Sequence, residues 1–418
     1  SYFGRGGVSE PPQIVWTFPE AAMCGPSSEG GQTRQWCGNG WTGQPAVFER
    51  DGRTWVVFGA YDHNIHFVDG ESGARILPDF PTGDIVKGSP TIDPDGYPIV
   101  YIGSRDNRLR AIAFDRATPT ELWSLDADSI GPTLWNDDWD GSPLVINDYL
   151  LEGGENSRFH IVKLNRAYGP DGLVTVDPQL VFHAAGWDQE LLNDLAGFEL
   201  PRAVSIEQSV TVAGDTAWFA NSGGLLQGWD VSFIRTGQGE PTRTFRYWLG
   251  DDSDASIVAD ADGYLYVGVE YERGTNRSAE VGQMLKLDPG RPDNPIVWSV
   301  SDDNANKSGT WSTAAVLDEL VIWPTRAGTV YGIDRATGAV RWRVELPAPL
   351  MGSPVVVDDV WIQGDCDGTL HGFDVSDPAV PPPELWSVAL GGCIEATPAV
   401  WDGRIYVGTR AGREFALE

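Results

Sequence analysis

The chain has 418 residues, and 41% of them are hydrophobic, which supplies a large core and excludes an intrinsically disordered chain. Lys and Arg total 29 against 60 Asp and Glu, so the formal net charge is −31. This charge disfavours a protein that reads duplex DNA or an anionic membrane, because both need a basic surface. No apolar run approaches the roughly 18 residues of a membrane-spanning helix.

The composition favours short strands, since 50 Gly and 29 Pro supply many turns and 18 Trp favour strands. A repeated strand opening supports this prediction. Gly-Ser-Pro followed by β-branched or apolar residues occurs at 88–90, 141–143 and 352–354, and five degenerate copies bring the total to eight. The copies begin near residues 44, 89, 142, 209, 256, 313, 353 and 397.

Each copy predicts a four-stranded unit. After the opening strand come a second strand, a tight turn, a third strand ending in an apolar-x-Asp step, and a fourth strand carrying a tryptophan. The spacing of the copies runs from 40 residues (314 to 354) to 67 residues (143 to 210). A period in this range, with insertions, is typical of propeller blades.

The two ends of the chain complement each other. The last repeat stops at residues 415–418, which align with a third strand, and residues 12–18 resemble the fourth strand around Trp386. We therefore expect an all-β fold in which residues 1–418 form a single domain. This domain is an eight-bladed β-propeller of four-stranded antiparallel blades, closed by the N-terminal strand joining blade eight.

The third and fourth strands also carry a family resemblance. Residues 332–342, Gly-Ile-Asp-Arg-Ala-Thr-Gly-Ala-Val-Arg-Trp, resemble the tryptophan-docking motif AxDxxTGxxxW of quinoprotein-type (PQQ-like) propellers, and residues 113–123 match nearly as well. That family includes pyrroloquinoline quinone (PQQ) dehydrogenases, non-enzymatic scaffolds such as BamB, and uncharacterised extracytoplasmic proteins. The chain resembles the scaffold and uncharacterised members more than the dehydrogenases. The resemblance implies that the docking tryptophans pack against neighbouring blades.

The opening strands of a propeller line its central channel, so residues three positions before each aligned proline form a ring at one mouth. The ring is Thr42, Lys87, Asp140, Glu207, Asp254, Trp311, Met351 and Glu395. We predict a metal site here, with Asp140, Glu207, Asp254 and Glu395 as ligands, because Ca²⁺ prefers several oxygen ligands. Hydroxyl residues two positions further on add oxygens. The alternatives are separately solvated carboxylates in a wet channel, and neutralisation by Lys87.

The four cysteines form no CxxC pair and no CxxCH haem motif. Cys24 and Cys37 both fall in the loop entering blade one. Cys366 falls in the turn after the second strand of blade seven, and Cys393 in the loop entering blade eight, on the same face. We predict disulfides Cys24–Cys37 and Cys366–Cys393, which imply an oxidising, extracytoplasmic location, whether secreted, periplasmic or cell-surface.

Two functions remain open. The expected one is a non-enzymatic binding or scaffold protein with a Ca²⁺-type cation at the channel mouth. The alternative is a PQQ- and metal-dependent alcohol or sugar dehydrogenase, with Trp311 or Trp139 as cofactor-binding residues and Asp137 or Asp138 as catalytic base. The chain lacks the adjacent-cysteine pair that the family enzymes often carry, and it is shorter than they are. PQQ is therefore not expected.

The predicted partners follow from the same face. We expect a protein, small-molecule or glycan ligand on the loops around the channel mouth, because a rigid propeller presents its loops for binding. The acidic composition argues against a nucleic-acid partner. We expect a monomer.

Overall fold

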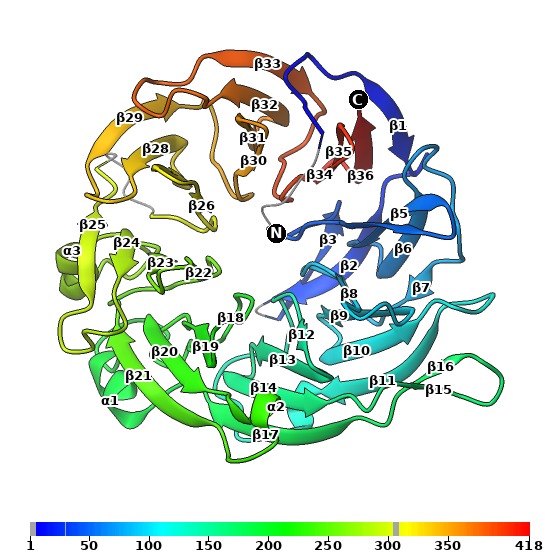
Figure 1. Cartoon of the computed structure of the whole chain (residues 1–418), viewed down its shortest axis with the longest axis horizontal. Coiled ribbons are helices and arrows are strands. Elements are labelled where there is room, and N and C mark those ends of the chain that lie inside the picture. Colours follow the sequence, from blue (N-terminus) through cyan, green and yellow to red (C-terminus); the bar gives the residue numbers. More distant parts are fainter. Residues whose placement is uncertain (1–5, 30, 304–308) are drawn as a thin grey trace.

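The computed structural model describes residues 6–29, 31–303 and 309–418. Within them, eight four-stranded antiparallel sheets stand radially around a central channel (Figure 1). The predicted all-β, eight-bladed propeller is thus confirmed. Each innermost strand begins two residues after the corresponding repeat position, for example β4 at Ala46 and β34 at Ala399.

The blades follow the chain in order, and their strands are given from the channel outward. The first four blades are β4 (Ala46–Arg50), β5 (Arg53–Gly59), β6 (Asn64–Asp69) and β7 (Phe80–Pro81); β8 (Thr91–Ile92), β9 (Ile99–Ser104), β10 (Arg108–Ala113) and β11 (Thr120–Asp126); β12 (Leu144–Ile146), β13 (Tyr149–Gly154), β14 (Arg158–Lys163) and β17 (Gln179–Ala185); and β18 (Thr211–Ala213), β19 (Thr216–Phe219), β20 (Leu225–Asp230) and β21 (Thr242–Trp248).

The second half of the ring repeats this order. Its blades are β22 (Val258–Ala259), β23 (Leu265–Gly268), β24 (Met284–Leu287) and β25 (Ile296–Val300); β26 (Ala315–Val316), β27 (Leu320–Pro324), β28 (Thr329–Asp334) and β29 (Val340–Glu345); β30 (Val355–Val357), β31 (Val360–Gly364), β32 (Thr369–Asp374) and β33 (Glu384–Ala389); and β34 (Ala399–Trp401), β35 (Arg404–Thr409), β36 (Arg413–Leu417) and β1 (Ile14–Phe18).

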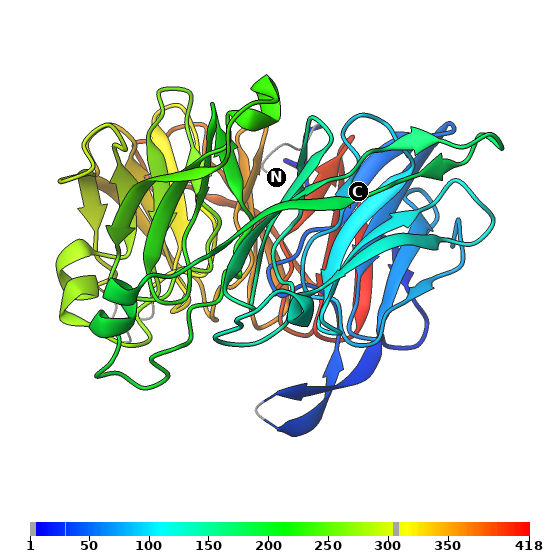
Figure 2. The ribbon, with the colours of Figure 1, turned by 90° about the horizontal axis from the view of Figure 1, so that it is seen from below.

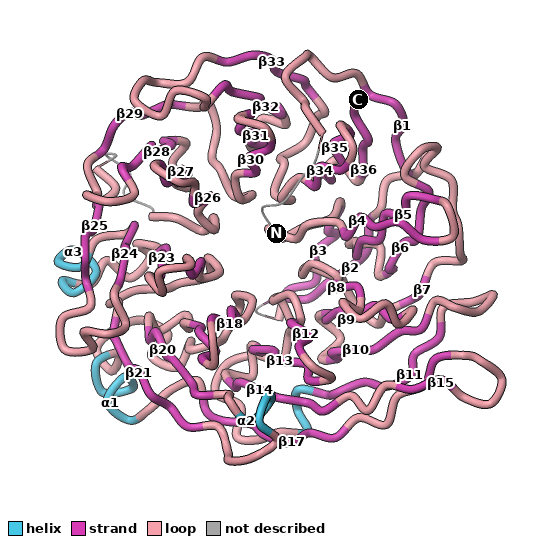
Figure 3. Tube along the Cα trace, viewed as in Figure 1, coloured by secondary structure: helices cyan, strands magenta, loops and turns pink. Residues whose placement is uncertain are grey.

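The remaining elements lie outside the blades. Two hairpins, β2 (Cys24–Glu29) with β3 (Gln32–Cys37) and β15 (Ala167–Tyr168) with β16 (Val174–Thr175), project from the ring. Seen edge-on, the β2–β3 hairpin stands out from one face of the disc (Figure 2). The short helices α1 (Gln189–Asp194), α2 (Phe233–Thr236) and α3 (Asn276–Val281) lie at the periphery (Figure 3). None of the helices in the described parts is long and apolar enough to cross a membrane.

The ring closes as the two chain ends predict. Strand β1 pairs antiparallel with β36, with Trp16 opposite Ala416 and Phe18 opposite Glu414. The indole N–H of Trp16 donates to the carbonyl of Gly70 in blade one at 2.9 Å. Strand β1 therefore covers the edge of β36 and joins blade eight to its neighbour, which removes an exposed sheet edge.

The docking motif has a direct physical explanation in blade six. Asp334 accepts hydrogen bonds from the backbone N–H groups of Ala336 and Thr337 at 3.1 and 2.8 Å, which fixes the turn. Trp298 of the preceding blade packs on Gly338, where a β-carbon would lie 2.6 Å from the tryptophan. The Trp298 indole donates to the Arg335 carbonyl at 3.1 Å. The tryptophans thus hold adjacent blades together, as the resemblance implies.

Candidate functional site

The channel encloses a cavity of about 550 Å³ lined by the innermost strands and the loops that enter them. Asp140, Glu207, Asp254 and Trp311 all line it. The hydroxyl positions predicted from the repeat line it as well, together with the glutamine that takes this place in blade one. They are Gln44, Ser89, Ser142, Ser209, Ser256, Thr313, Ser353 and Thr397.

The hydroxyl groups connect adjacent blades. The backbone N–H of Ser209 donates to Ser256 Oγ at 3.1 Å, and the N–H of Ser256 donates to Thr313 Oγ1 at 3.0 Å. The same bond recurs at four more junctions, namely Gln44 to Ser89, Ser142 to Ser209, Thr313 to Ser353 and Ser353 to Thr397. Because these oxygens already accept backbone N–H groups, they hold the inner strands in register.

Three positions converge at the channel mouth in each of two blades. They are the ring residue, the residue two positions before it, and the residue 15 or 16 positions after it, which comes just after the second strand. In blade three the three positions are Asp138, Asp140 and Glu155, which we call triad 3. In blade five they are Asp252, Asp254 and Glu270, which we call triad 5. Within each triad one carboxylate oxygen from each residue lies within 4.8 Å of the other two.

Triad 3 surrounds the ammonium group of Lys87. The Nζ atom lies 2.6 Å from Asp140 Oδ2 and 3.3 Å from both Asp138 Oδ2 and Glu155 Oε1. Arg105 Nε adds a contact of 2.8 Å to Asp138. The lysine, contributed by blade two, therefore takes the place that a bound cation would have.

Burial and charge shift the titration of triad 3 and its lysine. Burial raises the pKa of Asp138 to about 8 and of Asp140 to about 7, although Lys87 acts in the opposite direction. Burial by itself would lower the pKa of Lys87, but the three carboxylates hold it well above its usual value. The ammonium is therefore charged at neutral pH.

The four predicted metal ligands fall into different environments. Asp140 contacts Lys87, and Glu395 forms an ion pair with Arg410 at 3.0 Å. Glu207 accepts hydrogen bonds from Ser205 Oγ at 2.5 Å and Ser222 Oγ at 3.2 Å. Asp254 belongs to triad 5. Sequence reasoning missed Asp252 and Glu270, although overlaying the Asp-x-Asp and later Glu of blades three and five reveals the shared spacing.

Triad 5 is more weakly neutralised than triad 3. Glu270 is 1% exposed, and one oxygen of each member, Asp252 Oδ1, Asp254 Oδ1 and Glu270 Oε1, is buried and accepts no hydrogen bond. Among the described residues, the only cationic group within 4.0 Å of the triad is Arg273, whose Nη1 lies 3.9 Å from Asp252 Oδ2. Burial, and then repulsion between neighbouring carboxylates, raises the pKa of all three acids well above the usual range.

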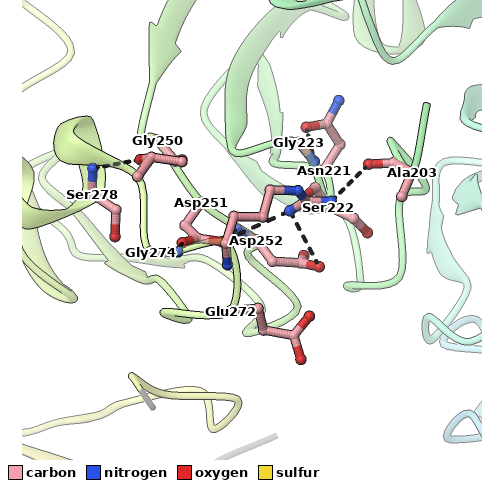
Figure 4. Close-up of polar contacts among 12 residues, drawn as sticks. Ala203, Asn221, Ser222, Gly223, Gly250, Asp251, Asp252, Glu272, Gly274 and Ser278 are labelled. Atoms are coloured by element: carbon pink, nitrogen blue, oxygen red, sulfur yellow. Dashed lines mark hydrogen bonds and ion pairs between the residues drawn. The ribbon is translucent and has the colours of Figure 1, made fainter. Parts of the chain in front are cut away.

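Figure 4 shows the surroundings of Asp252 in blade five. Asp251, beside it, accepts hydrogen bonds from the backbone N–H groups of Arg273 and Gly274 at 3.1 and 2.9 Å. The Arg273 guanidinium donates to the carbonyls of Ser222 and, at 3.2 Å, Ala203 on blade four. The Arg273 guanidinium therefore donates its hydrogen bonds mainly to backbone carbonyls.

The aromatic candidates do not offer an open platform for a planar cofactor. Trp311 packs against Trp41, with ring centroids 5.5 Å apart, and the Arg326 guanidinium lies 4.0 Å from the Trp311 ring centroid. Trp139 is 1% exposed and donates its indole N–H to the Asn107 carbonyl at 3.0 Å. The rings on which a quinone would have to stack are therefore already packed against other groups of the chain.

The two candidate bases differ in environment. Asp137 is half-buried, and burial raises the pKa of its carboxyl group. Asp138 is held by Lys87 and Arg105 in triad 3.

Both predicted disulfides are present. Cys24–Cys37 closes the base of the β2–β3 hairpin, and Cys366–Cys393 joins blades seven and eight. In these blades Cys366 and Cys393 occupy the positions that correspond to Glu155 and Asp138 of triad 3. The same mouth positions therefore carry acids in some blades and a covalent link in others.

Comparisons with known proteins agree with this architecture. The sequence model of the family described as outer membrane protein assembly factor BamB matches residues 286–381. A comparison with curated protein sequences gives no match. The resemblance to PQQ-like propellers is therefore confirmed at the level of repeat and fold.

Three solved structures illustrate the shared fold. BamB from Moraxella catarrhalis is 15% identical, with 89% of this chain and 93% of that chain covered and a TM-score of 0.59. The computationally designed Ika8 protein is 14% identical, with coverages of 89% and 94% and a TM-score of 0.60. The quinohemoprotein alcohol dehydrogenase from Comamonas testosteroni is 15% identical, with coverages of 98% and 77% and a TM-score of 0.62. One fold thus accommodates a protein named as an assembly factor and another named as an enzyme, so activity must be argued from the site.

Proposed function

We propose that the chain is an extracytoplasmic, non-enzymatic binding or scaffold propeller whose mouth face receives a protein, small-molecule or glycan ligand, with a Ca²⁺-type cation bound at the mouth. The observation that carries this proposal is the occupation of the mouth by the chain's own side chains. Lys87 fills triad 3, and Trp41 and Arg326 pack on Trp311. The dehydrogenase alternative would need both places to be open.

Two disulfides and the BamB-like repeat support a location outside the cytoplasm, where cysteine pairs persist. The mouth face also carries features suited to binding. The disulfide-closed β2–β3 hairpin projects from the disc (Figure 2), and Trp135 in the loop before triad 3 is 42% exposed. Aromatic rings on rigidly held loops supply contact area at low entropic cost.

The test of the proposed function is a titration of the protein with PQQ in the presence of Ca²⁺, with tryptophan fluorescence as the readout. A dye-reduction assay with alcohols and sugars runs in parallel. We expect neither saturable quenching nor dye reduction at micromolar PQQ. Saturable quenching that is lost in Trp311→Leu, together with substrate-dependent dye reduction, would overturn the proposal in favour of the dehydrogenase.

A positive test uses a glycan and peptide binding screen with two matched variants. Trp135→Ala changes the mouth face, whereas Tyr168→Ala changes another exposed aromatic, on the β15–β16 hairpin of the opposite face; Tyr168 is 57% exposed. Loss of a saturable ligand in the first variant only would support binding at the mouth. Equal loss in both variants, or in the second only, would contradict it.

A further inference from the structure

The internal repeat offers a comparison between two copies of one site. Triad 3 and triad 5 have residue spacings that differ by one position, the same place at the channel mouth, and one carboxylate oxygen per residue within 4.8 Å of the others. Triad 3 binds a cation, the Lys87 ammonium, at 2.6 to 3.3 Å. The geometry of these three positions therefore suits a positive charge at their centre.

The residue that supplies this charge is replaced in the copy at blade five. Lys87 is the ring residue of the blade that precedes triad 3, and the ring residue of the blade that precedes triad 5 is Glu207. Glu207 lies close enough to raise the pKa of Asp252 by charge repulsion, and the carboxylate of Asp254 in turn raises that of Glu207. The ring position that supplies an ammonium beside triad 3 thus supplies a further carboxylate near triad 5.

The chain's own cations do not compensate for this acid excess among the described residues. Arg273 donates to the carbonyls of Ser222 and Ala203, and its nearest approach to the triad is 3.9 Å, at Asp252. Glu270 is almost fully buried, with Oε1 accepting no hydrogen bond. Buried, unpaired carboxylates are costly, so they bind a cation or take up protons.

We propose that Asp252, Asp254 and Glu270, assisted by Glu207 from blade four, bind one divalent cation of the Ca²⁺ type. Carboxylate oxygens are the ligands that hard cations prefer, and Ca²⁺ accepts six to eight of them in irregular geometry. Asp254 and Glu207 also line the channel, so waters or an oxygen-bearing ligand can complete the coordination from that side. This site shares Glu207 and Asp254 with the ring that the sequence predicts and adds Asp252 and Glu270, and it rests on the mouth cation of the proposed function.

Isothermal titration calorimetry with CaCl₂ on the chelator-treated, full-length protein tests the proposal. We expect one ion per chain, a dissociation constant at or below the ~10⁻³ M of weak extracellular Ca²⁺ modules, and a higher melting temperature with Ca²⁺. No saturable heat and no thermal shift up to about 10 mM Ca²⁺, well above that range, would overturn the proposal.

Matched variants locate the ion. Glu270→Gln should weaken binding by about tenfold or more, as expected when an ion loses a carboxylate, whereas Glu155→Gln, the same change in triad 3, should leave it unchanged. Equal effects, or an effect of Glu155→Gln alone, would place the ion elsewhere and refute the assignment. If Glu270→Gln fails to fold, Asp252→Asn at a more accessible carboxylate gives the same test. Failure of Ca²⁺ binding would remove the cation from the proposed function but would leave the PQQ and ligand-binding results unaffected, so the two failures are distinguishable.

Discussion

Replacing Lys87 by methionine removes the ammonium group inside triad 3, after which Arg105 is the one cationic group of the described residues in contact with its carboxylates. The lost contacts are at 2.6 Å to Asp140 and 3.3 Å to Asp138 and Glu155. A unit charge pair at about 3 Å attracts by roughly 5 kcal/mol at an effective dielectric of about 20, but desolvation of the ions offsets much of this. Breaking a buried ion pair from one side costs about 3–5 kcal/mol, and we expect Lys87→Met to destabilise by that amount.

The loss should depend on pH and on Ca²⁺. The acids of triad 3 have raised pKa values in the folded state, so the stability that their protonated forms contribute is lost as pH rises through those values. In Lys87→Met the uncompensated charge strengthens this effect, so the variant should be closer to the wild type at pH 5.5 than at pH 8.5. Removing the tethered ammonium should also open triad 3 to Ca²⁺, giving a second bound ion.

Equilibrium unfolding in guanidinium chloride at both pH values, with and without about 5 mM Ca²⁺, an amount above the ~10⁻³ M of weak extracellular sites, measures these effects. Lys286→Met is the matched control, because Lys286 is also largely buried but contacts the Arg335 carbonyl at 3.2 Å and the Tyr264 ring. It should lose less stability and gain no second ion. Equal losses for the two variants at pH 8.5 would refute the argument that Lys87 neutralises triad 3.

Three further predictions concern stability. Burial raises the pKa of Glu414 to about 8, so the wild-type protein loses stability as pH rises from the unfolded-state pKa near 4.5 to pH ~8. Compared with the wild type, Glu414→Gln should therefore be more stable at pH 8.5 than at pH 4 by up to roughly 3–5 kcal/mol. Parallel plots of stability against pH for the two proteins would contradict this. Deleting residues 1–19 exposes β36 and should lower the melting temperature of the whole ring, and an unchanged melt would rule out the closure. Replacing Cys366 and Cys393 by serine opens a loop of sequence separation 27, which should cost about 3–4 kcal/mol in chemical unfolding; a loss below about 1 kcal/mol would show that the link adds little.

Much of the fold could be predicted because its signals are local and repeated. The strand openings recur at each blade, and the inner strands begin two residues after them. The similarity of residues 12–18 to the strand around Trp386 predicted the pairing of β1 with β36. The loop positions of Cys24, Cys37, Cys366 and Cys393 predicted both disulfides. Each of these inferences needs only the order and spacing of residues along the chain.

The sequence by itself determined which residues reach the channel mouth, because the repeat register assigns each position a place in its blade. Only the tertiary structure decided what those residues contact there. Lys87 crosses to the acids of blade three, Glu395 pairs with Arg410, and Glu270 meets Asp252 and Asp254. These partners come from different strands and blades, so the direction of each side chain and the burial around it decide which charges are neutralised, and the distance along the chain does not.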